Sequence, residues 1–346
     1  MLRKIAVTAA IVAGALVITS RAQEKPTGQG FSFRTGVELI NVTATVTDEH
    51  GRFVGNLKAD DFTVYEDGKP QPIQQFDSER VPVSLGIALD TSGSMIGEKI
   101  TAAQAALNRF LYDLLGTSDE VFLYRFDSRP ELVSGWTNDR QAVGRALGTV
   151  RPSGGTAIYD TVAEAVPLAQ KGTRRKKALV VISDGNDQNS RRRIDDVRQL
   201  IRESEVLVYA IGIDASGTPT QTYSTPQGLA KPTYSPSPFP GKAPPPSTPK
   251  PAAPAPAPSR SHSSSDRMNA DALRAITDDS GGRTEIIVSP NDLAPATAGI
   301  ADELSRQYFI GYSSSAPKDG KWHEIELRLN KPGNLTVRAR KGFISS

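Results

Sequence analysis

Hydrophobic positions follow two different patterns along the chain. Between residues 83 and 307, short and almost wholly apolar runs alternate with segments whose apolar residues recur every three or four positions. The runs at 83–89, 177–183 and 206–213 are typical of strands buried on both faces of a parallel sheet. Residues 99–115 place their apolar side chains on one side of a helix. This alternation predicts an α/β fold with an open, doubly wound, mostly parallel sheet.

The two flanks of this core alternate apolar and polar positions, as antiparallel strands do. Residues 31–80 contain the turn sequence Glu66-Asp67-Gly68-Lys69, and residues 308–346 alternate again between turn sequences. The ends of an inserted domain lie close together, so we expect the flanks to pair into one small β-sandwich-like companion. The predicted organisation is an N-terminal β unit over 31–80, an α/β domain over 83–307, and a C-terminal β segment over 308–346.

Proline is concentrated in one part of the α/β region. Residues 215–266 hold 14 of the 25 prolines, together with a serine-rich stretch near the end. Such a composition cannot bury enough apolar surface to offset the entropy of ordering the chain. We therefore expect a disordered, solvated insertion over residues 215–266.

The first 22 residues have the composition of an export signal. Arg3 and Lys4 precede an apolar run over residues 5–18, and the small residues Ser20 and Ala22 follow. The run is shorter than the ~20 residues that a spanning helix needs. We expect a signal peptide over residues 1–22, a secreted or periplasmic protein, and no stable membrane span after cleavage.

Charge and cysteine content exclude several classes of protein. The formal charge of +3 comes from 41 basic and 38 acidic residues, and loss of Arg3, Lys4 and Arg21 with the signal brings it to 0. A nucleic-acid partner is therefore not expected. The chain has no cysteine, so disulfides, thiolate metal sites and thiol nucleophiles are excluded.

Oxygen-bearing side chains directly follow two of the buried runs, and another lies in a loop between these runs. They are Asp90, Ser92, Ser94, Thr156 and Asp184. The first three come directly after the first buried run, the fourth lies in a glycine-rich loop, and the last follows the second buried run. Ligands of open α/β sheets bind beyond the carboxyl ends of the strands, where these residues are predicted to lie. Oxygen ligands favour a hard divalent cation, Mg²⁺ or else Mn²⁺ or Ca²⁺, over zinc.

Each residue also has an ordinary structural interpretation. Asp90 and Asp184 could begin turns, whereas Ser94 and Thr156 could cap helices. Together, however, three segments that end at one edge of a sheet carry five oxygen ligands for an octahedral ion and leave one position for another ligand. The combination predicts a metal site more specifically than any of its parts.

The same segments resemble a known family. Asp90-x-Ser92-x-Ser94, residues 155–160 and residues 180–185 resemble the three segments of the metal-ion-dependent adhesion site (MIDAS) of von Willebrand factor A (VWA) domains, in the same order. The resemblance covers about residues 83–307, apart from the proline-rich insertion. More loosely, the flanks resemble a bacterial VWA-related group.

The resemblance implies a role for each site residue. Ser92, Ser94 and Thr156 would bind the metal through their hydroxyls, while Asp90 and Asp184 would act mainly through bound waters or by direct contact in the unliganded state. An ion that no carboxylate of the domain touches is under-compensated in charge and attracts the Asp or Glu of a partner. The expected function is metal-dependent protein–protein interaction or adhesion by capture of a partner carboxylate, without enzymatic activity.

Two enzymatic alternatives receive little support from the residues. A serine hydrolase is disfavoured because neither motif serine lies in a Gly-x-Ser-x-Gly sequence, and His50, His262 and His323 lie in the flanks or the insertion. A Mg²⁺-dependent phosphoester hydrolase would want a second acid beside Asp90 and a basic phosphate clamp. A structural alternative stays open: an envelope-assembly subunit whose metal site only stabilises the fold.

Overall fold

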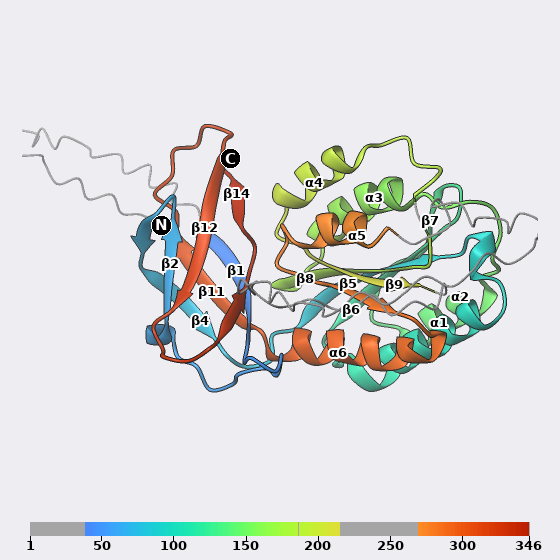
Figure 1. Cartoon of the computed structure of the whole chain (residues 1–346), viewed down its shortest axis with the longest axis horizontal. Helices are drawn as coiled ribbons and strands as arrows, with labels where there is room; N and C mark the ends of the chain where they lie inside the picture. The colour runs from blue at the N-terminus through green and yellow to red at the C-terminus, as the bar shows by residue number, and fades with distance from the viewer. Residues whose placement is uncertain (1–38, 186, 215–268, 346) are drawn as a thin grey trace, which may run out of the picture. The chain divides into compact units, whose positions relative to one another are not determined.

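The computed structural model of the protein describes residues 39–185, 187–214 and 269–345 (Figure 1). The predicted signal peptide over 1–22, the first residues of the N-terminal β unit and the predicted insertion over 215–266 lie outside the described residues. Everything described falls within one of the two units of the chain, Val37–Ser346.

A six-stranded sheet forms the centre of the α/β part, in the order β10-β9-β8-β5-β6-β7. Its strands are β5 (Val83–Asp90), β6 (Glu120–Phe126), β7 (Pro130–Thr137), β8 (Lys176–Ser183), β9 (Leu207–Ile213) and β10 (Thr284–Ile287). All neighbouring pairs are parallel except β6 and β7, which are antiparallel. The carboxyl ends of β5 and β8 therefore reach the same edge of the sheet.

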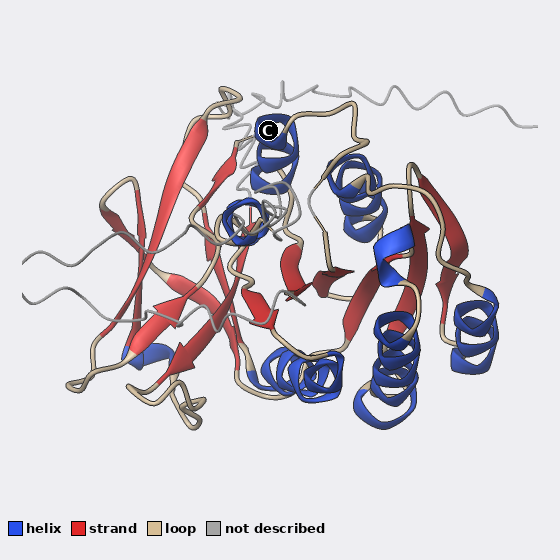
Figure 2. Cartoon of the chain, turned by 45° about the vertical axis from the view of Figure 1, so that its right-hand side comes forward, coloured by secondary structure: helices blue, strands red, loops and turns tan. Residues whose placement is uncertain are grey.

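Helices cover both faces of this sheet (Figures 1 and 2). One face carries α3 (Ile158–Gln170), α4 (Ile194–Arg202) and α5 (Ala270–Thr277), and the other carries α1 (Glu98–Arg109), α2 (Arg140–Thr149) and α6 (Leu293–Arg306). Leu85 and Ile87 of β5 point into the core beneath α1 and α6, whereas Ala88 points into the core beneath α3. Burial on both faces explains why β5 is apolar at nearly every position, and the predicted fold class is confirmed.

The flanks of the chain form two antiparallel four-stranded sheets. One sheet consists of β1 (Leu39–Thr47), β4 (Ile73–Asp77), β11 (Tyr308–Ser313) and β13 (Thr336–Arg338). The other consists of β2 (Phe62–Glu66), β3 (Lys69–Gln71), β12 (Trp322–Leu329) and β14 (Gly342–Ile344). Side chains of both sheets share one hydrophobic core, so the flanks form the predicted β-sandwich-like companion.

Short helical turns complete the described elements. They are η1 (Ala59–Asp61), η2 (Gly93–Met95), the π-helical turn η3 (Phe110–Leu114) and η5 (Pro290–Asp292). The sequence predicted one helix over 99–115, but α1 ends at Arg109 and continues as η3. The sequence did not predict β7, which lies at the edge of the sheet and has no buried residue. It begins with proline. Proline has no N–H to donate to a neighbouring strand, so within sheets it occurs at edge strands and at the first residue of a strand.

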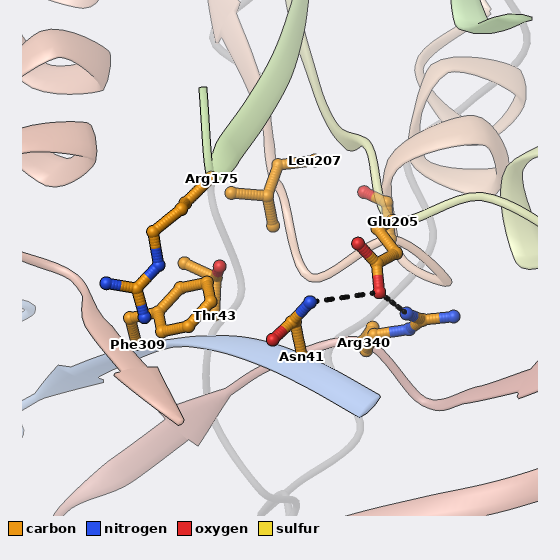
Figure 3. A pocket seen from close by; sticks show the side chains of 8 residues that line it. Asn41, Thr43, Arg175, Glu205, Leu207, Phe309 and Arg340 are labelled. Atoms are coloured by element: carbon orange, nitrogen blue, oxygen red, sulfur yellow. Dashed lines mark hydrogen bonds and ion pairs between the residues drawn. The ribbon is translucent and has the colours of Figure 1, made fainter. Parts of the chain in front are cut away.

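Polar contacts join the sandwich to the α/β part (Figure 3). The Glu205 carboxylate accepts a hydrogen bond from Nδ2 of Asn41 at 3.4 Å and lies 3.9 Å from the guanidinium of Arg340. The guanidinium of Arg175 lies over the ring of Phe309, 4.1 Å from its centroid. These contacts connect β1, β11 and the C-terminal flank to loops at the amino ends of the central strands.

One ion pair makes the stability of the sandwich depend on pH. Nδ1 of His323 lies 2.7 Å from Oδ2 of Asp67, and the histidine residue is only 7% exposed. The hydrogen bond to Asp67 raises the pKa of His323 above its ordinary value of 6.5, and the same bond lowers the pKa of Asp67. When the pKa of a histidine is higher in the folded state than in the unfolded state, the histidine stabilises the fold at pH values below its unfolded-state pKa. This contribution disappears as the pH rises through the folded-state pKa.

We therefore expect His323→Gln to cost more stability at about pH 5, below the unfolded pKa of histidine, than at about pH 8.5, where less of the contribution of the ion pair remains. Urea denaturation of the wild type and the variant at both pH values measures the difference in the free energy of unfolding. His50→Gln is the matched control, because the side chain of His50 is 65% exposed. An equal loss for His323→Gln at both pH values would contradict the prediction.

Candidate metal-binding site

The loops beyond β5 and β8 carry most of the candidate ligands. Asp90 is the last residue of β5, and Asp184 directly follows β8. The strands pair in parallel up to Leu89 and Ile182, so both carboxylates leave the sheet at the same edge. The turn η2 follows Asp90 and leaves Ser94 exposed.

Asp90 is a fully buried carboxylate. Its Oδ1 accepts a hydrogen bond from the Ser92 main-chain N–H at 2.8 Å, and its Oδ2 accepts one from the Ser183 hydroxyl. Burial raises the pKa of Asp90 to about 6, although these hydrogen bonds act in the opposite direction. The ionised carboxylate is thus only partly compensated by its protein partners, and a nearby cation would stabilise it.

A continuous chain of oxygen atoms connects the first loop to Asp184. The hydroxyl oxygens of Ser92 and Ser94 lie 2.9 Å apart, and the Ser94 hydroxyl donates to Oδ1 of Asp184 at 2.7 Å. The other carboxylate oxygen, Oδ2, forms an ion pair with Nζ of Lys99. Oxygen atoms from two separate segments therefore converge at one point on the edge of the sheet.

The loop that carries Thr156 is tied to both other segments by its backbone. The Gly154 carbonyl accepts from the Gly93 N–H at 3.0 Å, which links this loop to the loop after β5. The Thr156 carbonyl accepts from the N–H groups of Gln188 and Asn189 at 2.9 and 3.0 Å, and the Thr156 N–H donates to the Asn189 side-chain carbonyl at 3.1 Å. This close clamp explains the preceding glycine, because a Cβ at position 155 would lie 1.9 Å from Oδ1 of Asn189.

The hydroxyl of Thr156 points toward the turn after β8. A Cβ placed on Gly185 would lie 3.4 Å from Oγ1 of Thr156, so this hydroxyl is beside the residue that follows Asp184. The structure thus brings the predicted residues of all three segments to one edge of the sheet. Their role as metal ligands stays a prediction.

Three nearby residues were missed by the sequence analysis. Ser183 donates to Asp90, Asn189 holds Thr156, and Lys99 pairs with Asp184. Lys99 alone had a usable signal, since it is a positive charge five positions after Ser94 at the start of a predicted helix.

The chemistry of the donors suits a hard divalent cation. Hydroxyl and carboxylate oxygens are the ligands that Mg²⁺, Mn²⁺ and Ca²⁺ accept. In the described parts of the chain, no cluster of three or more histidine, cysteine, aspartate or glutamate side chains could hold a metal. A site at this edge would therefore depend on its serine and threonine hydroxyls as well as on its two carboxylates.

Comparison of sequences identifies the α/β part. The family model of the von Willebrand factor type A domain matches residues 85–186, which include all the candidate ligands. An uncharacterized protein of Synechocystis sp. is 31% identical over 114 residues, which make up 32% of this chain. The matched segment spans only 27% of the length of that relative.

Two bacterial proteins are among the solved structures that match this chain. The conserved hypothetical protein BatB from Bacteroides thetaiotaomicron superimposes with a TM-score of 0.44 and 19% identity, covering 64% of this chain and 97% of its own. A von Willebrand factor type A protein from Catenulispora acidiphila gives a TM-score of 0.47 and 14% identity, covering 90% of this chain and 75% of its own.

Within residues 39–185, 187–214 and 269–345, no helix is long and apolar enough to cross a membrane. The family match spans β5 to β8, so residues 85–186 of the α/β part are similar in sequence to a VWA domain.

Proposed function

We propose that the protein binds a divalent cation at the edge of its VWA domain and uses this ion to capture a carboxylate of a protein partner. The proposed ligands are Asp90, Ser92, Ser94, Thr156 and Asp184. VWA domains commonly bind a divalent metal and mediate interactions between proteins, and they are generally not enzymes. We accordingly propose no catalytic activity for this chain.

One observation carries the proposal: the hydroxyls of Ser92 and Ser94 lie 2.9 Å apart, and Ser94 contacts the Asp184 carboxylate at 2.7 Å beside the buried Asp90. Such a cluster contains only oxygen donors, which matches the preference of Mg²⁺, Mn²⁺ and Ca²⁺. Ser94 is exposed, so a ligand from another molecule can reach an ion bound to its hydroxyl. When hydroxyls supply much of the coordination, the positive charge of the ion stays under-compensated and favours an incoming carboxylate.

Export is part of the same proposal. A cleaved signal over residues 1–22 would deliver the domain to the periplasm or the cell exterior, where adhesion or docking takes place. Mass determination of the protein recovered from periplasm and medium tests this step. A mature chain that still begins at residue 1 in the cytoplasm would contradict it.

A calorimetric titration tests the capture of a carboxylate. We expect a short Asp- and Glu-containing peptide to bind in the presence of Mg²⁺ or Mn²⁺ and not in the presence of a chelator. Ser94→Ala should weaken both metal and peptide binding by roughly tenfold or more, because it removes one ligand of the ion. Ser305→Ala on α6 is the matched control, since its hydroxyl donates to the main chain of its own helix.

Three further measurements separate the alternative functions. A metal site that only stabilises an envelope subunit predicts a metal-induced rise in the melting temperature without chelator-sensitive partners in an envelope extract. A Mg²⁺-dependent phosphoester hydrolase predicts turnover of a generic phosphoester by protein and metal alone. Peptide binding that persists unchanged in chelator would overturn the proposal.

A further inference from the structure

A lysine ammonium lies within the candidate metal site. Lys99 is the second residue of α1, and its Nζ pairs with Oδ2 of Asp184 and lies 3.1 Å from the Ser94 carbonyl oxygen. The Asp184 side chain is fully buried, whereas the Lys99 side chain is 21% exposed. Asp184 thus gives one oxygen to the Ser94 hydroxyl and the other to the ammonium.

The position of Lys99 needs a specific explanation. Cations are unfavourable in the first turn of a helix, where the helix dipole is positive, and lysine is favoured in the last turn. The Asp184 carboxylate supplies the compensating charge, because it forms an ion pair with Lys99. The contact is therefore maintained by the site and not by the helix.

The electrostatics of the two carboxylates explain why a cation is needed there. Asp90 and Asp184 are both buried at this edge of the sheet. Buried carboxylates without a countercharge are costly, so the ammonium of Lys99 stabilises the site in the absence of a metal.

We propose that Lys99 acts as an internal cation that competes with the divalent metal for Asp184 and so sets the metal affinity of the site. This inference rests on the proposed function. A divalent ion held by the same oxygens would repel the adjacent ammonium, because two positive charges a few ångströms apart interact strongly where water is largely excluded. The flexible four-carbon stem of lysine lets the ammonium leave toward solvent, where Lys99 is already partly exposed.

The competition has two measurable consequences. Replacing Lys99 by a neutral residue should strengthen metal binding, because the ion no longer displaces an ammonium. The same replacement should destabilise the metal-free protein, because Asp184 loses its countercharge. A merely structural role of Lys99 would produce the second effect without the first.

Calorimetry and thermal unfolding of the full chain test the inference with Lys99→Gln and Lys99→Arg. We expect Lys99→Gln to bind Mg²⁺ and Mn²⁺ on the order of tenfold more tightly than the wild type, as loss of one charge-assisted contact implies. Its melting temperature should be lower than that of the wild type in chelator and should rise more on addition of metal. Lys99→Arg retains the charge and should stay within roughly threefold of the wild-type affinity. Lys171→Gln, at an exposed position after α3, controls for the change in net charge.

A measurement on the wild-type protein avoids any problem of folding. Acetylation of Lys99 by an acylating reagent, followed by peptide mass spectrometry, should be several-fold faster with saturating Mg²⁺ than with chelator, because only an unpaired amine reacts readily. The acetylation rate of Lys171 should not change.

The outcomes distinguish the two proposals. If the wild type binds metal and Lys99→Gln binds it equally or more weakly, the competition is refuted while the metal site stands. Acetylation of Lys99 that is independent of metal in a metal-binding wild type refutes it as well. If neither the wild type nor Lys99→Gln binds a divalent ion, the proposed function itself falls, and the inference with it.

Discussion

Asp90→Asn is expected to abolish most of the metal affinity while leaving the fold intact. The substitution preserves the shape of the side chain, and its amide can still accept from the Ser92 N–H and contact the Ser183 hydroxyl. It removes the negative charge that stabilises the cation from within the sheet. We expect a loss of metal affinity of about 100-fold, at the upper end of what loss of a coordinating or orienting group costs.

The stability of Asp90→Asn makes the prediction sharper. Burial raises the pKa of Asp90 to about 6, so the folded protein disfavours the ionised form. A carboxyl group whose pKa is higher in the folded state than in the unfolded state destabilises the fold once the pH exceeds its unfolded-state pKa. Near neutral pH and in chelator, the variant should therefore unfold at the same temperature as the wild type or a higher one.

Isothermal titration with Mg²⁺ and Mn²⁺, combined with thermal unfolding in chelator, measures both effects. Asp127→Asn is the matched control, because Asp127 directly follows the neighbouring strand β6 but is not among the proposed ligands. Wild-type metal affinity in Asp90→Asn would show that Asp90 does not support the ion.

Glu303→Gln is expected to be the most destabilising of the proposed changes. Glu303 lies on α6, and its side chain is only 10% exposed. Its Oε2 accepts from Nε of Arg283 at 2.9 Å, and its Oε1 accepts from the Tyr209 hydroxyl at 2.9 Å and pairs with Arg338. The Thr45 hydroxyl donates to the same oxygen at 3.1 Å. One carboxylate thus connects β9 and α6 of the α/β part with β1 and β13 of the sandwich.

The charge of Glu303 is the essential property in this network. Burial alone would raise the pKa of Glu303, but the adjacent guanidiniums of Arg338 and Arg283 hold it below its ordinary value. Glutamine keeps the size of the side chain but removes the countercharge of Arg338 and leaves Arg283 paired with Glu285 alone. Breaking a buried ion pair on one side costs about 3–5 kcal/mol, and partial exposure of both arginines favours the lower end of that range.

Urea denaturation of Glu303→Gln measures this loss as a lower midpoint. Asp302→Asn is the control on the same helix, because its side chain is 50% exposed and pairs with Arg306 across one turn. Such a surface pair contributes about 0–1 kcal/mol. Comparable losses for the two variants would show that the buried network does not hold the sandwich to the α/β part.

Local patterns were sufficient for the architecture of the α/β part. Residues 83–89 are apolar at nearly every position because β5 is buried on both faces, and the sequence reports that burial directly. The location of the candidate ligands was also predictable, because the carboxyl ends of parallel strands lie at the same edge of a sheet. The edge strand β7 gave no such signal, because its side chains are partly exposed and do not alternate.

Long-range polar pairing was decided only by the tertiary structure. Neither the pairing of Lys99 with Asp184 nor the clamp of Asn189 on Thr156 has a periodicity that a sequence can display. The same holds for Glu303, whose partners come from strands far away along the chain. Hydrophobic periodicity reports which faces of a helix or strand are buried, so the sequence alone determined most of the elements, the fold class and the edge that carries the oxygens. Which charge neutralises which depends on segments that meet only when the sheets and helices pack, so the tertiary structure determined the countercharges of the site and the junction with the sandwich.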